Sequence, residues 1–441
     1  MKIKEAICLF EFDCVMVSKV DEEEAGIHQI SERAFKYLKK LCLDETSDTK
    51  FLKLKSYQAK EVIQFQNYAG VITTPDGTQV EVLPKIAKYG ADKESSIIEA
   101  RSSLLNMLSE LGHFRHIQTS SSNIKKQKMP LLEIYIGQFL NSVAELIRRG
   151  LKSSYCAQSG NLLYLRGKLK VSEQIKRNSV NKHKFAVEYD EYLPDIYENR
   201  LVKTAISKVL SMTRTNESQK LARELLFAFD GVSLLEIPKS NAKKIALQRD
   251  MEHYKIPVIW SNLILTGHSP LTMSGEANAF SLLFPLEAVF ENYVAKTLNK
   301  LVKSPLHLKT QAATKSLVSY NAKPMFRLKP DLLISCNGED QIVLDTKWKL
   351  IDLAKDNGTD KFQLSQADFY QMFAYGHKYL GGAGELILIY PKTDRFYKPV
   401  PYSFDFDEGL KLWVVPFDIK DGIRDSNRFD LKVVKSVWEL S

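Results

Sequence analysis

The sequence lacks several features that would assign it at once to a well-known class of protein. Only five of its 441 residues are cysteine, and they are spread from Cys8 to Cys336 without a CxxC pair. This excludes a disulfide framework and gives no support for a zinc ribbon or an iron–sulfur cluster. No stretch approaches the ~20 apolar residues of a membrane span, and Glu5, Glu11 and Asp13 interrupt the N-terminal segment where a signal peptide needs an apolar run. We therefore expect a cytoplasmic protein with no membrane partner.

Motifs of nucleotide-binding proteins and of common hydrolases are also missing. A P-loop needs the spacing GxxxxGK[ST]; the nearest approach, from Gly160 to Gly167-Lys168, has too many residues between its glycines and continues with leucine. HExxH and GxSxG do not occur. We therefore expect that the chain binds no nucleotide on its own.

The composition is that of a globular protein with an uneven charge distribution. Hydrophobic residues make up 44% and charged residues 26%, and at ~150 residues per domain the length suggests about three domains. The net charge is +9, yet the segment from Arg115 to Lys184 alone holds 14 basic and three acidic residues. This basic segment is either an ordinary solvated surface or a surface that meets a polyanion or a protein partner.

The pattern along the chain predicts an α+β protein of several domains. Residues 1–95 are expected to form a β-rich domain, and residues 96–265 a helical region that carries a long basic β-hairpin at about 160–198. Residues 266–279 have few apolar side chains and are expected to be a linker. In the last domain, residues 280–441, the expected order is helix, hairpin, helix, strand.

The hairpin of this last domain carries the most informative chemistry, in the segment FRLKPDLLISCNGEDQIVLDTKWK. Asn337-Gly338 is a strong turn pattern between two strands, expected over 328–335 and 341–348. If the hairpin is centred on Gly338, Asp331 lies opposite Asp345, and Lys347 shares their face. Opposed carboxylates repel unless a cation lies between them, and oxygen ligands suit Mg²⁺ or Mn²⁺. Two acids, a lysine and such a metal predict a phosphodiester hydrolase.

Two predicted helices flank this hairpin in the sequence. The first, FPLEAVFENYVAKTLNKL, presents Glu287 and Glu291 on one face, where they either approach the metal or are ordinary solvated acids. The second, expected over 366–380, brings Gln371 and Tyr375 to one face, and the apolar segment ELILIY follows as a buried strand.

These elements in this order resemble the PD-(D/E)xK nuclease superfamily, and the glutamine–tyrosine helix resembles its RecB-like branch. The resemblance implies that Asp331, Asp345 and Lys347 carry catalysis. Asp331 and Asp345 would hold the metal, and Lys347 would orient the attacking water or the transition-state phosphate. Glu291 matches the upstream acidic position of the superfamily only loosely, and Gln371 and Tyr375 are candidate accessory residues.

Further blocks resemble the McrC family, the nuclease subunit of McrBC-type restriction systems. They are GTQVEVLPKI, EARSSLLNML, RRGLKSSY, LRGKLKVSEQIKRN and FAVEYDEYLPDIYENRLVK. This resemblance implies a β-rich and helical N-terminal partner-binding region followed by a C-terminal PD-(D/E)xK (restriction-endonuclease-like) α/β nuclease domain. It also implies two partners, double-stranded DNA and a hexameric ring of the AAA+ GTPase McrB, through which GTP would act. The residues implied to meet that ring are basic: Arg166, Lys168, Lys170, Lys176 and Arg177.

Two other functions remain open. A non-catalytic activator of the ring could use a nuclease fold as a scaffold, but intact Asp331, Asp345 and Lys347 argue against it. A standalone DNA repair nuclease of RecB type is the second alternative, and the large N-terminal portion without cluster cysteines or a helicase motor argues against that one.

Overall fold

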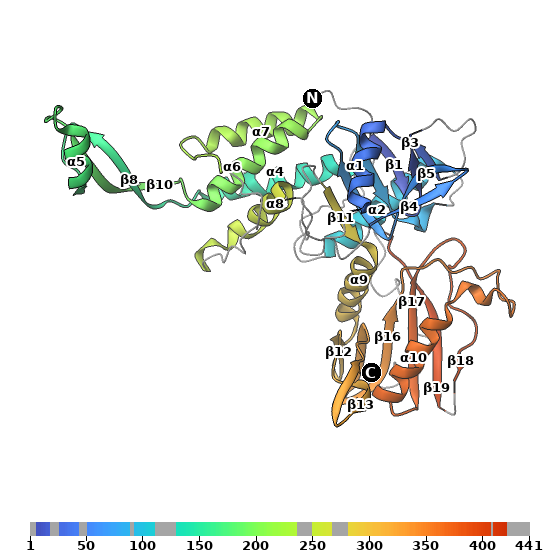
Figure 1. Ribbon diagram of the computed structural model, residues 1–441. Coiled ribbons are helices and arrows are strands. Elements are labelled where there is room, and N and C mark those ends of the chain that lie inside the picture. The colour runs from blue at the N-terminus through green and yellow to red at the C-terminus, as the bar shows by residue number, and fades with distance from the viewer. Residues whose placement is uncertain are drawn as a thin grey trace. The chain divides into compact units, whose positions relative to one another are not determined.

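The computed structural model describes residues 6–17, 26–43, 51–88, 92–110, 129–235, 249–266, 281–406 and 409–420. The chain forms two compact units (Figure 1). The first comprises Met1–Met129, Pro270–Gly275 and Leu283–Ser441, and the second Pro130–Ser269 and Glu276–Leu282. This division differs from the predicted boundaries, because the C-terminal region packs into the same unit as residues 1–95. Apart from Thr266, the predicted linker 266–279 lies outside the described residues.

Two four-stranded sheets form the N-terminal part of the first unit. One has the order β1-β7-β6-β11, in which β1 runs parallel and β6 antiparallel to β7. The other has the order β3-β2-β5-β4. The strands are β1 (Ala6–Phe10), β2 (Cys14–Met16), β3 (Ile27–Gln29), β4 (Leu52–Tyr57), β5 (Lys60–Phe65), β6 (Tyr68–Thr73), β7 (Gln79–Leu83) and β11 (Ser281–Pro285).

Helix α1 (Glu32–Leu43) lies within this β-rich region, where the sequence analysis predicted no helix. Ser31 caps it by accepting a hydrogen bond from the Ala34 N–H at 3.1 Å. Its apolar face buries Phe35 and Leu38 against β4 and β5. A second helix, α2 (Lys93–Glu110), also belongs to the first unit.

The C-terminal part of the first unit is a six-stranded mixed sheet with the order β12-β15-β16-β17-β19-β18. The central strands β16, β17 and β19 are parallel, and the outer pairs are antiparallel. The strands are β12 (Leu306–Thr310), β15 (Leu332–Cys336), β16 (Glu339–Thr346), β17 (Gly384–Pro391), β18 (Phe404–Asp405) and β19 (Leu410–Phe417). A separate hairpin joins β13 (Ser316–Tyr320) to β14 (Lys323–Arg327).

Helices α9 (Leu286–Leu301) and α10 (Gln366–Tyr379) confirm the two predicted flanking helices. On α9 an apolar stripe of Phe290, Val294 and Leu298 is fully buried. On α10, Met372 and Tyr375 pack against the central strands in one apolar cluster. This packed core fixes the positions of the β15–β16 turn and of the strand ends. The charged residues of the candidate site lie at those strand ends.

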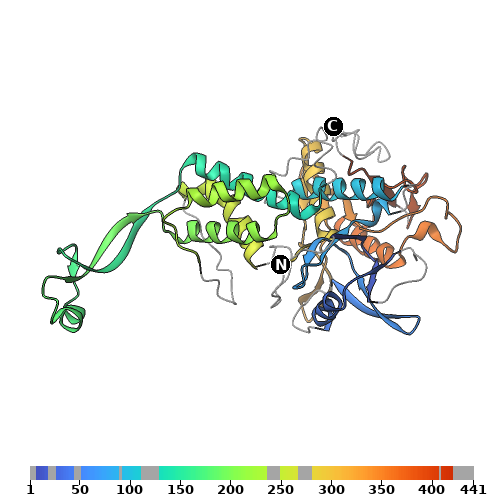
Figure 2. The same cartoon turned by 90° about the horizontal axis from the view of Figure 1, so that it is seen from above.

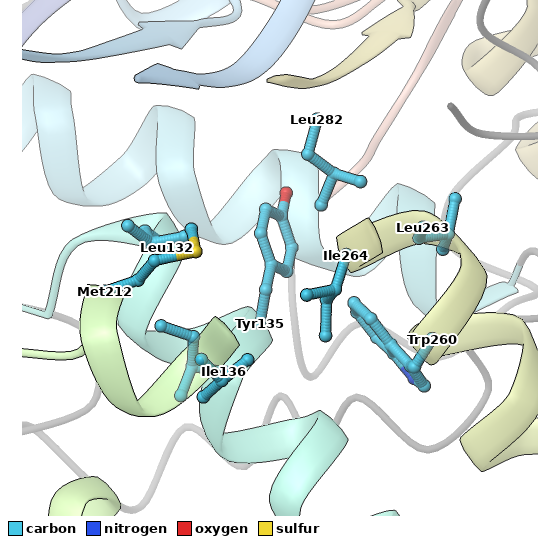
Figure 3. Close-up of a pocket in the computed structure, with 9 residues that line it drawn as sticks. Leu132, Tyr135, Ile136, Met212, Trp260, Leu263, Ile264 and Leu282 are labelled. Atoms are coloured by element: carbon cyan, nitrogen blue, oxygen red, sulfur yellow. The ribbon is translucent and has the colours of Figure 1, made fainter. Parts of the chain in front are cut away.

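The second unit is built on the helices α4 (Leu131–Arg149), α6 (Tyr197–Met212), α7 (Asn216–Ala228) and α8 (Lys255–Thr266). Apolar side chains of α4, α6 and α8, together with Leu282, surround Tyr135 and Trp260 (Figure 3). The cavity between them has a volume of only ≈ 10 Å³, which is at most the room of one water molecule. This interior is therefore a packed core and not a ligand site.

A two-stranded arm extends from these helices (Figures 1 and 2). Strands β8 (Ser154–Leu162) and β10 (Phe185–Leu193) pair antiparallel. A hairpin is thus present and its second strand lies in the predicted range, but its first strand lies almost wholly before residue 160. Its tip is different from the prediction: after the short β9 (Lys168–Leu169), the expected strand residues VSEQI form helix α5 (Val171–Asn178). Val171 and Ile175 are four residues apart, a spacing that fits a helix as well as a strand.

In the part of the chain that the structure describes, no helix is long and apolar enough to cross a membrane.

Candidate active site

The register of the β15–β16 hairpin brings the predicted carboxylates together. Asn337 and Gly338 form the turn, and both have positive φ (51° and 91°). Next to the turn, Cys336 pairs with Glu339, but a bulge shifts the register, so that Leu332 pairs with Leu344. Strand β15 begins four residues later than expected, so Asp331 lies just before it. Extended by one residue, the same register places Asp331 opposite Asp345, as predicted. The turn is centred between Asn337 and Gly338, half a residue before the predicted centre at Gly338. The bulge shifts the pairing by one residue and so restores the predicted register.

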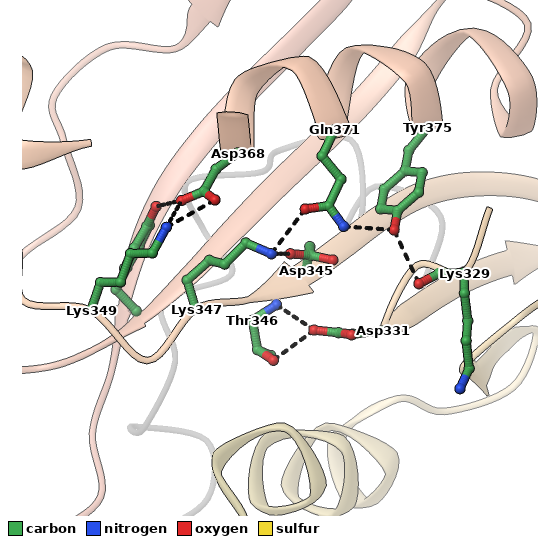
Figure 4. Close-up of polar contacts among 10 residues, drawn as sticks. Lys329, Asp331, Asp345, Thr346, Lys347, Lys349, Asp368, Gln371 and Tyr375 are labelled. Carbon is green, nitrogen blue, oxygen red and sulfur yellow. Dashed lines mark hydrogen bonds and ion pairs between the residues drawn. The ribbon is translucent and has the colours of Figure 1, made fainter. Parts of the chain in front are cut away.

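Asp345 and Lys347 form a buried ion pair on the face of the sheet that α10 covers (Figure 4). The Lys347 ammonium lies 2.5 Å from Asp345 Oδ2, and Asp345 is only 1% exposed. Burial, and then the charge of Asp331, raise the pKa of Asp345 from 3.8 to about 7. Burial alone would lower the pKa of Lys347, but the Asp345 carboxylate outweighs it and the net direction is upward. The lysine is thus held in its charged form.

Asp331 is fixed by the strand opposite it. The backbone N–H and the hydroxyl of Thr346 both donate to Asp331 Oδ2, at 2.8 and 2.7 Å. The backbone carbonyl of Asp331 accepts a hydrogen bond from the N–H of Gln311 at 2.7 Å. Thr346 lies between Asp345 and Lys347, so the DTK segment itself orients the facing acid.

Gln371 and Tyr375 extend this network from α10. The Lys347 ammonium donates to Gln371 Oε1 at 3.0 Å, and Gln371 Nε2 donates to the Tyr375 hydroxyl at 2.7 Å. That hydroxyl donates to the carbonyl of Lys329, two residues before Asp331 (Figure 4). The two accessory residues therefore form a chain of hydrogen bonds that links Lys347 to the segment carrying Asp331.

Glu291 approaches the site from α9 and is half-buried. Gln311 Nε2 donates to its Oε1 at 2.7 Å. Burial, and then the Asp331 carboxylate, raise the pKa of Glu291, so the two acids interact electrostatically. Its helix neighbour Glu287 instead accepts a hydrogen bond from Asn67. Among the described residues, no group of three or more His, Cys, Asp or Glu side chains is placed to hold a metal ion, so Glu291 does not complete such a group.

A second ion pair beside Lys347 was not predicted. Lys349 donates to both oxygens of the Asp368 carboxylate, at 3.0 and 2.7 Å, and the Tyr390 hydroxyl donates to Asp368 at 3.3 Å (Figure 4). Lys347 and Lys349 thus reach parallel acceptors on α10, three residues apart. The sequence does place Lys349 two residues beyond Lys347, but nothing in it marks Asp368 as the partner.

The predicted partner-binding residues lie around the tip of the arm. Lys168, Lys176 and Arg177 are exposed. Arg166 is half-buried, stacks over the Tyr189 ring at 4.2 Å and lies 3.4 Å from Glu191. Its neighbour Gly167 needs its φ of +69°, and a Cβ there would lie 2.4 Å from a backbone oxygen. Arg166 therefore makes contacts within the arm, through Tyr189 and Glu191.

Sequence reasoning missed the exposed apolar residues beside these cations. They lie on the connection from β8 to β9, on α5 and just after it: Leu163, Tyr164, Leu165, Val171, Ile175 and Val180. Apolar side chains gathered at such an exposed position indicate an interaction surface.

Comparison with known proteins gives a consistent result. A family model described as "McrBC 5-methylcytosine restriction system component" matches residues 63–391. A chain in the refined half-complex of the tetradecameric assembly of Thermococcus gammatolerans McrB AAA+ hexamers with bound McrC has the same fold, with a TM-score of 0.68 and 22% identity over 98% of this chain and 100% of that chain. The cryo-EM structure of the T. gammatolerans McrBC complex matches less well, with a TM-score of 0.47 and 22% identity over 68% and 89%. No curated protein matches this chain.

Proposed function

The chain belongs to the family of McrBC 5-methylcytosine restriction system components, and from this premise we propose that it is the DNA-cleaving, McrC-type subunit of such a system. Its C-terminal sheet with α9 and α10 would be the PD-(D/E)xK nuclease domain. The observation that carries the proposal is the arrangement of Asp331, Asp345 and Lys347 on one face of the β15–β16 hairpin.

The arrangement suits hydrolysis of a phosphodiester. Lys347 is held charged between the Asp345 carboxylate and Gln371 Oε1, in position to orient a water molecule or a phosphate oxygen. Thr346 donates both of its hydrogen bonds to Oδ2 of Asp331, so Oδ1 is the oxygen that would face a ligand. Preorganised charges of this kind stabilise the charge that develops on a phosphate.

The two carboxylates also fit a divalent cation. Burial, and then the facing Asp331 carboxylate, raise the pKa of Asp345, so its charge is unfavourable in this position, and a bound cation would offset that cost. Carboxylate oxygens without nitrogen or sulfur ligands suit Mg²⁺ or Mn²⁺, and Mg²⁺ commonly binds through one or two carboxylates, with water and substrate phosphate as its other ligands. Asp331 and Asp345 would hold the metal, which when bound would activate water and neutralise charge on the phosphate.

The second half of the proposal is a partner. We infer that the arm docks on a McrB-like AAA+ GTPase ring and stimulates its GTP hydrolysis. Exposed Lys168, Lys176 and Arg177 alternate with exposed apolar residues such as Ile175 and Val180 at the arm tip. An apolar patch rimmed by charge is typical of a protein-binding surface. In the related half-complex, McrC is bound to McrB hexamers.

A cleavage assay on methylated and unmethylated double-stranded DNA, with and without the partner and GTP, tests this function. Mg²⁺-dependent cutting that needs both partner and GTP is the expected result. Stimulated GTP turnover without any cutting would instead favour the non-catalytic activator. Cutting that needs neither partner nor GTP would favour a standalone repair nuclease.

A further inference from the structure

Trp348 lies between the two lysines of the candidate active site and points away from them. Lys347 and Lys349 reach acceptors on α10, whereas the Trp348 indole is 3% exposed and packs against Phe290 of α9, with ring centroids 5.3 Å apart. Strand β16 ends at Thr346, so after the Lys347 N–H, which donates to Ile389, no strand pairing sets the path of this segment. The buried indole is therefore the anchor of the segment that joins the two lysines.

The polar end of that indole is held by the N-terminal part of the first unit. Trp348 Nε1 donates to Glu11 Oε1 at 2.8 Å, and Glu11 is completely buried. The same carboxylate accepts a hydrogen bond from the Lys85 N–H at 2.9 Å, and the Lys85 ammonium lies 3.4 Å from its other oxygen. The Lys85 ammonium also donates to the carbonyl of Trp348 at 3.3 Å. Glu11 and Lys85 thus hold both the side chain and the backbone of this residue.

A buried carboxylate is an expensive way to join two parts of a protein. Removing Glu11 from water is unfavourable for its charged form, and burial raises its pKa against the opposing effect of Lys85. A packed apolar contact would join the parts at lower cost. The hydrogen bonds of Glu11 with the Trp348 indole N–H and of Lys85 with the Trp348 carbonyl are directional, so they fix the position of Trp348.

We propose that Glu11 and Lys85 are positioning residues of the nuclease site and act through Trp348. The N-terminal β-rich part would then be a component of the cleavage machinery and not only a partner-binding region. This inference rests on the proposed function, because it takes Lys347 as the group that acts on the phosphate.

The test uses the full chain with its GTPase partner, GTP, Mg²⁺ and DNA. Trp348→Phe keeps an aromatic ring, though a smaller one, and removes the N–H donor. Glu11→Gln keeps the shape and one acceptor oxygen and removes the charge. Both should lower kcat for cleavage by about tenfold or more, because small displacements of a catalytic group have large effects on rate. KM for DNA and GTP turnover should stay within about twofold, since neither variant touches the arm.

Asp13→Asn is the matched control. Asp13 is also a buried acid, two residues from Glu11, and it accepts hydrogen bonds from the Phe10 N–H and from Lys88. This control should lower the unfolding temperature, because the fold favours the charged form of Asp13, yet leave kcat within about twofold of wild type. If Asp13→Asn lowers kcat as far as Glu11→Gln, the effect is one of stability and the inference is wrong.

Two further variants separate the possible failures. The double variant Glu11→Gln/Trp348→Phe should be no slower than Trp348→Phe alone, because both changes act on the same contact between residues 11 and 348: Glu11→Gln weakens it and Trp348→Phe removes it. Additive losses, or a Trp348→Phe enzyme with the wild-type kcat, would overturn the inference. Lys347→Ala tests the premise. If this variant cuts DNA at the wild-type rate, the proposed function fails as well. If it is inactive, the results for Glu11→Gln and Trp348→Phe decide whether the inference holds.

Discussion

Replacing Asp345 by asparagine should stabilise the metal-free protein, although the residue is almost completely buried. Burial and the Asp331 carboxylate raise the pKa of Asp345 from 3.8 to about 7, so the fold disfavours its charged form. At about 1.4 kcal/mol per pKa unit, this difference corresponds to about 4 kcal/mol. Asparagine at position 345 removes that cost. It also ends the ion pair with Lys347, but the Lys347 ammonium keeps its hydrogen bond to Gln371. Because the raised pKa of Asp345 already includes the opposing effect of Lys347, we expect a net gain of about 1–3 kcal/mol in the free energy of unfolding at pH 8.

The pH dependence has a definite sign. Because the pKa of Asp345 is higher in the folded than in the unfolded chain, its protonation stabilises the fold fully below about pH 4, and this contribution is lost as the pH rises through about 7. The wild-type free energy of unfolding should therefore fall between pH 4 and pH 8 more steeply than that of Asp345→Asn.

Urea unfolding of both proteins in EDTA, at pH 5 and pH 8, measures this difference. The matched control is Asp368→Asn, which removes another buried acid, one that accepts two hydrogen bonds from Lys349, and should destabilise the protein. The reasoning is refuted if Asp345→Asn is less stable than wild type at pH 8 in EDTA, or if both lose stability in parallel as the pH rises.

Three further outcomes are expected. Cleavage should stop on chelation of divalent ions and return with Mg²⁺ or Mn²⁺, whereas Ca²⁺ should support DNA binding without efficient cutting, as measured by gel assays; cutting in excess EDTA would contradict the metal site. Gln371→Ala should lower kcat by about tenfold with little change in DNA affinity, because Lys347 loses an acceptor; an unchanged kcat would remove Gln371 from the site. Reversing four cations at the arm should weaken the complex with the GTPase, and the wild-type complex should weaken as salt rises, both measurable by GTP turnover; undiminished turnover would exclude charge-driven docking. Those cations are Lys168, Lys170, Lys176 and Arg177.

The local part of the site could be predicted from sequence because its geometry follows from a short hairpin. Asn337-Gly338 fixes the turn, and strand alternation then places Asp331, Asp345 and Lys347 on one face. The prediction of the register was helped by an unpredicted bulge, because without it the tighter turn would have moved Asp331 out of line with Asp345. Gln371 and Tyr375 followed from helical spacing in the same way.

The missed features depend on contacts between distant segments or on ambiguous short patterns. Glu11 meets Trp348 across 337 residues, and no periodicity relates the two. Asp368 could be placed on a helix face, but its choice of Lys349 depends on how α10 packs on the sheet. Helix α1 did carry a local pattern, since Ser31 caps a segment with Phe35 and Leu38 on one face. The short segment VSEQI fitted both a strand and a helix.

The central claim is that Asp331, Asp345 and Lys347 form a nuclease site separate from the surface that activates the partner. The most direct measurement follows DNA cleavage and GTP turnover together in one reconstituted complex containing Lys347→Ala. Lys347 is engaged by Asp345 and Gln371 and not by the arm. The account predicts that cleavage is lost while GTP turnover stays at the wild-type level. Cleavage at the wild-type rate by this variant, with Mg²⁺ present, would contradict it.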